Sequence, residues 1–250
     1  MIVSGAWDGV VRVWDLVSGN LHCEPLCVHC RSAYPAVRSV AVATLDGRPV
    51  IVSGGHDTTV RVWDLDARVP LYEPLRGHEG PVFSVAVGTL DGRPLIVSGG
   101  PHTVQVWDLA SGARVGEPLR GHENPVWSVA VGALQGRPLI VSGGDDGTVR
   151  VWDLASRTPG GEPLRGHKGG VTSVAIGTLE GRPVIVSGGV DSTVRLWNAG
   201  GGMVSKVRIG SSVNALAFAN AGKFAVATTR GLLLLQFGME AITRSAEHKV

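Results

Sequence analysis

The chain has few of the features that identify membrane, secreted or nucleic-acid-binding proteins. No apolar run approaches the roughly 20 residues that a membrane-spanning helix needs. Its first residues, MIVSGAWDGVVRVWDL, show no basic segment followed by an apolar one, so no signal peptide is expected. The formal net charge of +2 is too small to favour nucleic acid or an anionic membrane as a partner.

Cysteine is also scarce. The three cysteines, Cys23, Cys27 and Cys30, do not make a disulfide framework, so we expect a reducing cytoplasm as the location and hence reduced thiols. With two histidines they form the string HCEPLCVHC, which suggests a zinc site. The string overlaps a repeated strand, however, in which successive side chains would point to opposite sides. We therefore interpret it as degenerate repeat sequence and expect no metal or other cofactor.

What the sequence does contain is a repeat. The segment RPLIVSGGDDGTVRVWDLASRTPGGEPLRGH, residues 137–167, recurs with small changes, and its tryptophan recurs at intervals of 49, 44, 45 and 45 residues. These tryptophans are Trp14, Trp63, Trp107, Trp152 and Trp197. Asp follows the first four, and Asn follows the fifth. A period of about 40–45 residues with this dipeptide is typical of a four-stranded propeller blade.

The fourth copy divides into four short runs that we predict to be strands. Val, Ile and Trp dominate the runs, and Gly, Pro, Asp or Asn lies between them, which is typical of strands closed by turns. The predicted strands are Val126–Val131, Leu139–Ser142, Thr148–Trp152 and Glu162–Arg165. Gly-Gly-Asp-Asp-Gly between the second and third favours a hairpin, and Gly136 predicts a turn before the second.

With these motifs in register, the chain resembles the WD-repeat β-propeller family, in a bacterial type with near-identical copies. The signature is Gly-His, then Ser-Gly-Gly-x-Asp, then Val-Arg-Val-Trp-Asp; it covers residues 1–198, with a degenerate copy to about 237. The resemblance implies an all-β fold, a single propeller of four-stranded antiparallel blades over residues 1–250. Its units are expected at 1–27 (incomplete), 28–76, 77–120, 121–165, 166–208 and 209–250 (degenerate).

The strand count predicts about six blades but leaves the ring two strands short. The first unit begins in its second strand at Ile2, and the last keeps only Val213–Ala219, Lys223–Thr228 and Leu232–Phe237. The tail Met239–Val250 is a candidate for one missing strand. An uncovered sheet edge invites pairing with another chain, so self-association is also expected. Two alternatives to an imperfect six-blade ring are a ring completed by an oligomer and a fragment of a seven-bladed or larger ring.

Each unit also carries polar residues that resemble a hydrolase triad. A buried Trp needs an acceptor for its indole N–H, which Ser can provide, while His can join the hydroxyl and Asp can orient the imidazole. Because an enzyme needs one active site rather than several copies, we predict structural tetrads, no catalytic residue and no enzyme. The full tetrads are His29, Ser53, Asp57 and Trp63; His122, Ser142, Asp146 and Trp152; and His167, Ser187, Asp191 and Trp197. The incomplete sets are His78, Ser98 and Trp107, without Asp, and Ser4, Asp8 and Trp14, without His.

Function is expected where near-identical copies differ at the surface. In WD-repeat propellers, partners usually dock on the face that carries the Gly-His loops and the turns between the second and third strands. The exposed positions there hold Trp7, Arg38, His56, Phe83, Trp127, Asp145 and Thr172, and the insertion Cys30–Pro35 extends the same face. Aromatic residues and Arg often anchor interfaces. The alternative is that Phe83 and Trp127 pack on neighbouring loops.

The sequence therefore predicts a non-catalytic scaffold that binds a protein or peptide partner on the loop face of a rigid propeller. One alternative is a regulatory or sensory segment of a larger signalling protein, suggested by the missing first strand. Another is an enzyme that uses the central channel. The innermost strands VFSVAV, VWSVAV and VTSVAI carry no acidic residue, which disfavours the second alternative.

Overall fold

The computed structural model describes residues 1–30, 32–179, 181–198, 200–218 and 223–236. Over these residues the structure is all-β, with six antiparallel sheets of three or four strands and no helix, consistent with a propeller of about six blades. The described part accordingly contains no helix that could cross a membrane. By its internal contacts the chain forms two compact units, Met1–Gly121 (unit 1) and His122–Val250 (unit 2).

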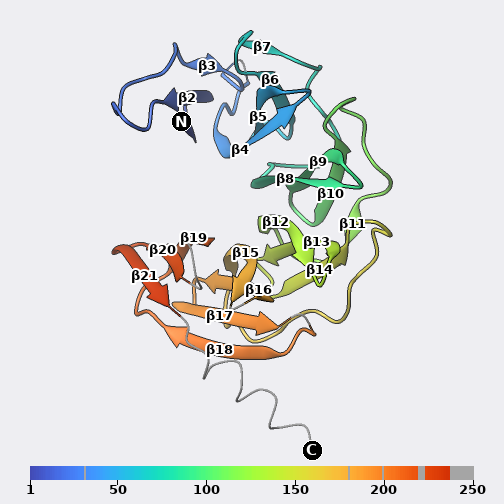
Figure 1. Cartoon of the computed structure of the whole chain (residues 1–250), viewed down its shortest axis with the longest axis vertical. Helices are drawn as coiled ribbons and strands as arrows, with labels where there is room; N and C mark the ends of the chain where they lie inside the picture. Colours follow the sequence, from blue (N-terminus) through green and yellow to red (C-terminus); the bar gives the residue numbers. More distant parts are fainter. Residues whose placement is uncertain (31, 180, 199, 219–222, 237–250) are drawn as a thin grey trace, which may run out of the picture. The chain divides into compact units, whose positions relative to one another are not determined.

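Unit 1 contains three sheets that follow one another along the chain (Figure 1). The first sheet has β1 (Ile2–Gly5), β2 (Val10–Trp14) and β3 (Leu26–Cys27). The second has β4 (Val37–Leu45), β5 (Arg48–Gly55), β6 (Val60–Asp64) and β7 (Val69–Pro70). The third has β8 (Ser84–Leu90), β9 (Arg93–Gly99), β10 (Thr103–Asp108) and β11 (Leu119–Arg120). β4 contacts both β1 and β8, so the middle sheet packs between its neighbours.

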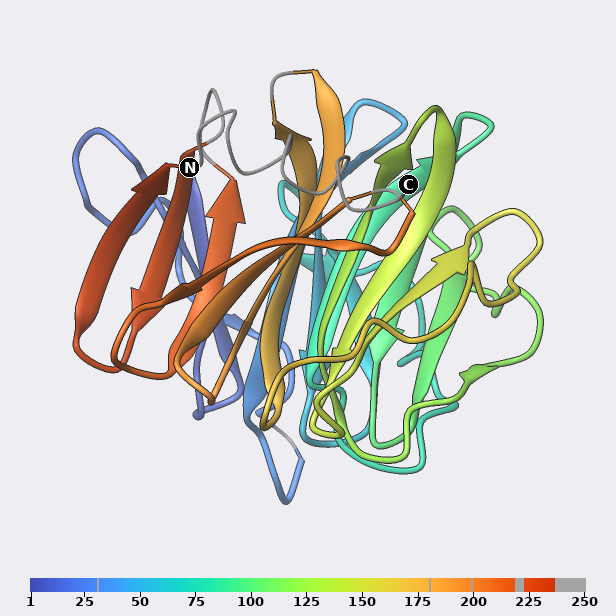
Figure 2. The same cartoon turned by 90° about the horizontal axis from the view of Figure 1, so that it is seen from below.

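Unit 2 repeats this arrangement. Its first sheet has β12 (Val126–Leu134), β13 (Arg137–Gly144) and β14 (Val149–Asp153). The second has β15 (Val171–Leu179), β16 (Arg182–Gly189), β17 (Thr193–Asn198) and β18 (Met203–Arg208). The third has β19 (Val213–Phe218), β20 (Lys223–Thr228) and β21 (Gly231–Gln236), drawn in red and orange in Figure 2. β15 contacts β12 and β19, and apolar side chains from all three sheets form the buried core.

The hairpin turns follow the predicted chemistry. Leu134 pairs with Arg137 across a two-residue loop, in which Gln135 and Gly136 have φ of 53° and 76°. Positive φ at both positions defines a type I′ turn, whose twist matches that of the flanking strands. The turn predicted at Gly136 is therefore confirmed.

The outermost strand predicted for the fourth repeat, residues 121–165, is wrong. The segment predicted as the strand Glu162–Arg165 forms a single isolated bridge, Leu164 with Val149, and the β12–β14 sheet has three strands. Proline cannot donate to a strand ladder, and glycine weakens a strand, so Gly160, Gly161 and Pro163 prevent regular pairing. Elsewhere β3, β7 and β11 span two residues each, and β18 spans six.

The first and last described strands, like the other edge strands of the six sheets, each have one partner among the described residues. β1 pairs with β2, and β21 pairs with β20. Leu232 and Leu234 on β21 are 74% and 64% exposed. The predicted tail strand Met239–Val250, together with Ala219 and Phe237, lies outside the described residues. Ring closure and self-association therefore stay predictions.

The cysteine expectation is wrong for two of the three residues. Cys27 and Cys30 form a disulfide, and Cys23 is free. β3 ends at Cys27, and the Ser32 N–H donates to the His29 carbonyl in the turn that follows. This turn brings the two Cα atoms to 5.5 Å, within the usual range for a disulfide. The alternation of an extended strand therefore does not separate these two side chains, and the cytoplasmic location stays a prediction without the support of reduced cysteines.

Candidate functional site

Two complete hydrogen-bonded tetrads lie in unit 2. Trp152 donates its indole N–H to Ser142 Oγ at 2.9 Å. His122 contacts Ser142 Oγ through Nε2 and Asp146 through Nδ1, both at 2.8 Å. The same contacts recur at 2.9, 2.8 and 3.0 Å in the tetrad of Trp197, Ser187, His167 and Asp191.

The turn between the second and third strands positions the aspartate. Asp146 Oδ1 accepts the backbone N–H of Thr148 at 2.9 Å and its hydroxyl at 2.7 Å. Burial lowers the pKa of His122, despite the opposing effect of Asp146. Burial would raise the pKa of Asp146, but the hydrogen bonds from Thr148 and His122 outweigh it and the pKa is lowered. With a neutral imidazole and an ionised carboxylate, Trp donates to Ser, Ser donates to His and His donates to Asp, so every group is satisfied.

The tetrad predicted for the second repeat, residues 28–76 in unit 1, is wrong in one member, because its tryptophan makes no hydrogen bond within the described residues. His29 contacts Ser53 Oγ and Asp57 at 2.9 Å each, but the buried indole nitrogen of Trp63 has no hydrogen-bond partner in the described structure. Cys27 occupies the position that arginine holds in other units, and this shorter side chain lies beside Trp63 in an open pocket. Trp63 is therefore only half-buried, whereas Trp152 is 1% exposed.

The third repeat, residues 77–120, lacks both the aspartate and the arginine that form a charged pair in other repeats. His78 contacts Ser98 at 2.7 Å, and Trp107 donates to Ser98 at 2.9 Å, but His78 Nδ1 is buried without a partner in the described residues. Without a carboxylate beside it, burial lowers the pKa of His78 to about 4. Gln105 stands where the other units have arginine. In other repeats Asp57 and Asp191 pair with the equivalent arginines at 3.2 and 3.6 Å. Because the third repeat lacks both the aspartate and the arginine, neither charge is left buried without its partner.

The first repeat, residues 1–27, keeps the hydrogen bond from tryptophan to serine although it has no histidine at the tetrad position. Trp14 donates to Ser4 Oγ at 2.8 Å. Asp8 is exposed, and its carboxylate pairs with Arg12 at 2.7 Å. The hydrogen bond from Arg12 is the main cause of the lowered pKa of Asp8. The polar contacts of this unit therefore lie near the surface.

The tetrads do not form a substrate site. Ser53, Ser98, Ser142 and Ser187 are 0% exposed. In three of these repeats the serine hydroxyl already accepts the indole N–H and contacts histidine. A nucleophile must reach its substrate, which these hydroxyls cannot do. In these three sheets the arrangement instead ties the strand that carries the tryptophan to the strand that carries the serine and to the preceding loop.

Unit 1 brings several predicted partner-binding residues together on one face. Trp7, in the β1–β2 turn, is 74% exposed, and the guanidinium carbon of Arg38 lies 4.5 Å from the centroid of its ring. His56, in the β5–β6 turn, lies with its ring centroid 5.3 Å from that of Tyr34, which is 67% exposed. We call Trp7, Tyr34, Arg38 and His56 the aromatic cluster.

Consecutive backbone groups join the two halves of the aromatic cluster. The Val37 N–H donates to the Ala6 carbonyl, and the Ala36 carbonyl accepts the His56 N–H, both at 2.9 Å. The turns that carry Trp7 and His56 are therefore held by adjacent residues of one chain segment. Tyr34 was not singled out by sequence reasoning, although the insertion that contains it was. Its aromatic type, in a segment with no counterpart in the other units, is the signal that could have identified it.

The remaining predicted positions differ in how much surface they offer. Phe83 in unit 1 is half-buried. In unit 2, Trp127 is 37% exposed and Asp145 is exposed. Thr172 is half-buried, and its hydroxyl lies within hydrogen-bonding distance of the carbonyls of Gly188 and Val213. Thr172 thus holds neighbouring strands together in addition to any role at the surface.

Comparison with known proteins identifies the repeats. No curated protein matches the chain. The family described as WD domain, G-beta repeat matches five segments, residues 1–15, 26–64, 69–108, 113–153 and 160–198. These segments end at or just after the five tryptophans that define the repeat. Proteins with such repeats are typically non-enzymatic scaffolds that mediate protein interactions. The chain belongs to the WD-repeat family.

Proposed function

We propose that this protein is a non-catalytic scaffold that binds a protein or peptide partner through the aromatic cluster of unit 1. The observation that carries the proposal is the exposure of Trp7, with Arg38 stacked on it and Tyr34 beside His56. Large aromatic side chains and arginine are the residue types that most often dominate binding energy.

The backbone around the cluster supports binding without a large ordering cost. The Gly9 N–H donates to the Ala6 carbonyl in the Trp7 turn, and the Gly55 N–H donates to the Thr59 carbonyl around the His56 turn. A surface whose backbone is already fixed loses little conformational entropy on association. The hydrogen bonds of His29 with Ser53 and Asp57 tie the segment before Tyr34 to β5 and the His56 turn, and they add to this rigidity.

A peptide selection tests the proposal. A displayed random peptide library is selected on the immobilised full chain, and the affinities of the selected peptides are measured by titration. Trp7→Ala and Arg38→Gln should each weaken binding by about 30-fold, the loss expected for an interface anchor of roughly 2 kcal/mol. Both changes should leave the melting temperature nearly unchanged.

Arg93→Gln is the matched control. Arg93 is exposed at the start of β9, at the end of the sheet opposite the turns that carry the cluster. Its loss should leave affinity unchanged. Peptides that bind Trp7→Ala and Arg38→Gln as tightly as the parent would contradict the proposal.

A further inference from the structure

A pocket of about 610 Å³ lies beside the disulfide in unit 1, away from the aromatic cluster. Cys27, Arg61, Trp63 and Arg68 line it, together with proline and aliphatic residues of β3, β7 and the segments next to β3. Cys27 stands where Arg76, Arg120 and Arg165 stand in other repeats, and a cysteine fills much less space; the equivalent pocket beside Arg165 and Trp197 is about 370 Å³.

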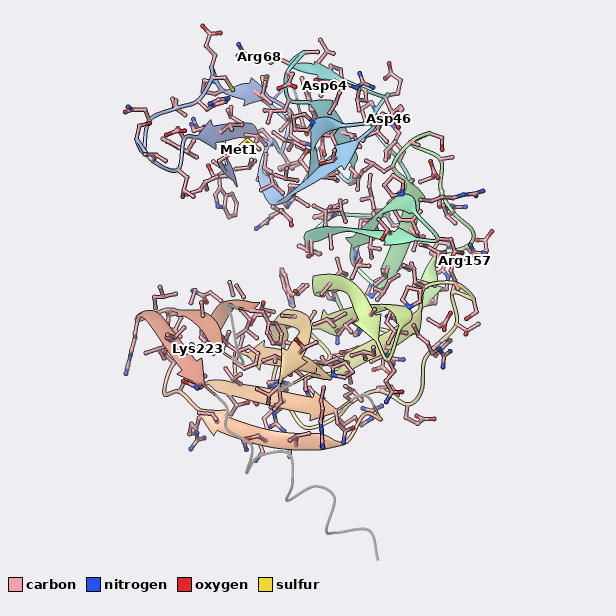
Figure 3. The ribbon with its side chains drawn as sticks, in the orientation of Figure 1. Met1, Asp46, Asp64, Arg68, Arg157 and Lys223 are labelled. Carbon is pink, nitrogen blue, oxygen red and sulfur yellow. A yellow bond between two sulfur atoms is a disulfide. The ribbon has the colours of Figure 1, made fainter. Side chains whose placement is uncertain are left out.

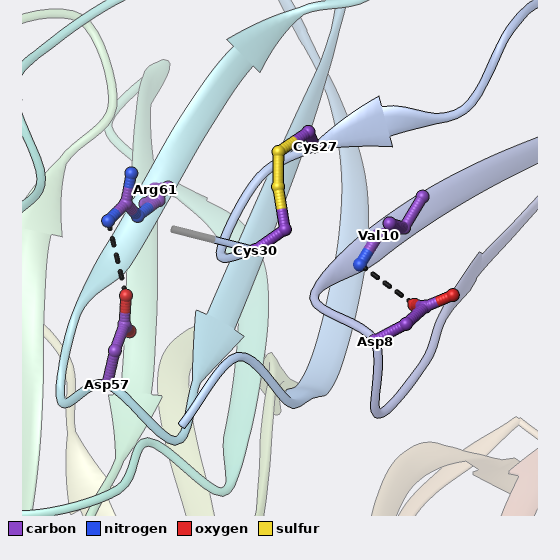
Figure 4. Close-up of a disulfide and its surroundings, with 6 residues drawn as sticks. All are labelled: Asp8, Val10, Cys27, Cys30, Asp57 and Arg61. Carbon is purple, nitrogen blue, oxygen red and sulfur yellow. Dashed lines mark hydrogen bonds and ion pairs between the residues drawn. A yellow bond between two sulfur atoms is a disulfide. The ribbon is translucent and has the colours of Figure 1, made fainter. Parts of the chain in front are cut away.

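The disulfide is open to solvent on the side of this pocket. Cys27 is exposed and Cys30 is half-buried (Figure 4). The two residues between them are fixed independently, since Val28 and His29 are each 1% exposed and the His29 N–H donates to the Gly9 carbonyl. Opening the disulfide therefore leaves the surrounding fold in place. Accessible disulfides are the ones that exchange with small thiols.

The pocket also offers donors to an anionic ligand. Arg68 is exposed and donates from one nitrogen to the Glu24 carbonyl, with the Glu24 carboxylate at 3.7 Å. Arg61 pairs with Asp57 at 3.2 Å. The remaining guanidinium N–H groups of Arg61 and Arg68 suit a carboxylate, which accepts several hydrogen bonds.

We propose that Cys27 is a thiol-exchange site for a small thiol that carries carboxylate groups and sits in this pocket. The thiolate sulfur of the small molecule attacks Cys27 Sγ, because Cys27 is the exposed sulfur. A new sulfur–sulfur bond forms to Cys27, the Cys27–Cys30 bond breaks, and Cys30 leaves with the electron pair and takes a proton from water. A second thiol attacking the small molecule's sulfur regenerates the Cys27 thiol, so two thiols are oxidised to their disulfide and the protein disulfide is reduced to a dithiol.

The test begins with the intact chain. After air oxidation, thiol titration should find one free thiol, Cys23, and three free thiols would overturn the proposal. Reduction of the disulfide is then followed with mercaptosuccinate and with 2-mercaptoethanol, and each rate is divided by the rate for the same chain unfolded in urea. This division removes the intrinsic difference between the thiols. The dicarboxylate should be favoured by roughly tenfold in the folded chain, the effect expected of one or two charge-assisted hydrogen bonds.

A single-cysteine variant isolates Cys27. In Cys23→Ala with Cys30→Ser, mixed-disulfide formation is measured by intact mass with oxidised glutathione and with the neutral bis(2-hydroxyethyl) disulfide, normalised in the same way. The anionic reagent should again be favoured by roughly tenfold. A ratio near one, in this variant or in the intact chain, would overturn the proposal.

The chain provides a closely matched arginine control. Arg68 and Arg157 occupy the same position in two repeats, four residues after the Asp of the Trp-Asp dipeptide, with φ of 61° and 57° (Figure 3). Their N–H groups donate to the Asp64 and Asp153 carbonyls at 2.9 and 2.8 Å. Arg68→Gln should remove most of the preference for the anionic reagent, and Arg157→Gln should leave it unchanged. Equal effects of both substitutions would show that the preference comes from overall charge and would contradict the assigned pocket.

Discussion

Trp152 donates its indole N–H to Ser142 at 2.9 Å. The indole N–H of Trp63, at the same position of another repeat, reaches no acceptor in the described structure. The two tryptophans stand at equivalent points of near-identical repeats. They therefore separate the contribution of the hydrogen bond from that of the aromatic ring.

Trp152→Phe should destabilise the fold by about 1–3 kcal/mol, because it removes a hydrogen bond in a fully buried site and some packing. Trp63→Phe removes a donor that is already unsatisfied, so its cost should be less than about 1 kcal/mol. Urea unfolding of the two variants checks this difference. Equal losses would contradict the role assigned to the Ser142 contact.

The buried His78 predicts a specific dependence of stability on pH. Burial lowers its pKa in the folded chain to about 4, below the ordinary value of 6.5. Between these values the unfolded state binds a proton that the folded state does not, so stability is complete above pH 6.5 and falls as the pH drops towards 4. The full shift corresponds to roughly 3 kcal/mol. His78→Asn should remove this component from the difference between unfolding free energies at pH 7 and pH 4.5, and an unchanged difference would contradict the assignment.

The turn between the second and third strands contains strained residues. Thr58 and Ser192 have φ of 70° and 60°, while Gly147 at the equivalent position has 73°. A β-branched residue in this conformation is costly, and glycine adopts it freely. Thr58→Gly should stabilise the fold by about 0.5–1 kcal/mol, and Gly147→Ala should destabilise it by about 1 kcal/mol. Thermal unfolding measures both, and a loss of stability in Thr58→Gly would contradict the strain argument.

The edge of β21 predicts how the protein behaves at high concentration. Within the described residues β21 pairs on one side only, and its Leu232 and Leu234 are largely exposed. Such an edge favours pairing with other chains, and lysine there opposes it. Leu232→Lys with Leu234→Lys should reduce concentration-dependent association in light scattering. The control is Leu16→Lys, a 66% exposed leucine outside the strands, which should have little effect.

The repeat determines much of what could be predicted. Strands β12 to β14 and the turn at Gly136 follow from residue types that act locally, such as Val-Ile-Val runs and glycine at positive φ. The tetrad contacts around Ser142 and Ser187 follow from the need of a buried indole N–H for an acceptor. These features depend on short-range chemistry that one repeat displays as clearly as five.

The failures occur where one copy departs from the others. The indole N–H of Trp63 lacks an acceptor among the described residues in the copy where Cys27 replaces an arginine, and the disulfide joins Cys27, at the end of β3, to Cys30. Neither effect is visible in the periodic pattern. Tyr34 lies in an insertion with no copy for comparison, so only the coordinates place it against His56. The missing outer strand near Leu164, where only one isolated bridge forms, reflects competition between strand pairing and nearby Gly and Pro.

The most direct test of the scaffold account is hydrogen–deuterium exchange of the full chain with and without a selected peptide. The account predicts that slowed exchange is confined to backbone amides in residues 6–8, 32–38 and 55–58, which carry the aromatic cluster. Exchange in β5 and β6 should stay as slow as in the free protein, because the surface is already ordered. Protection centred elsewhere, or a general slowing across unit 1, would contradict a pre-organised docking cluster at Trp7 and Arg38.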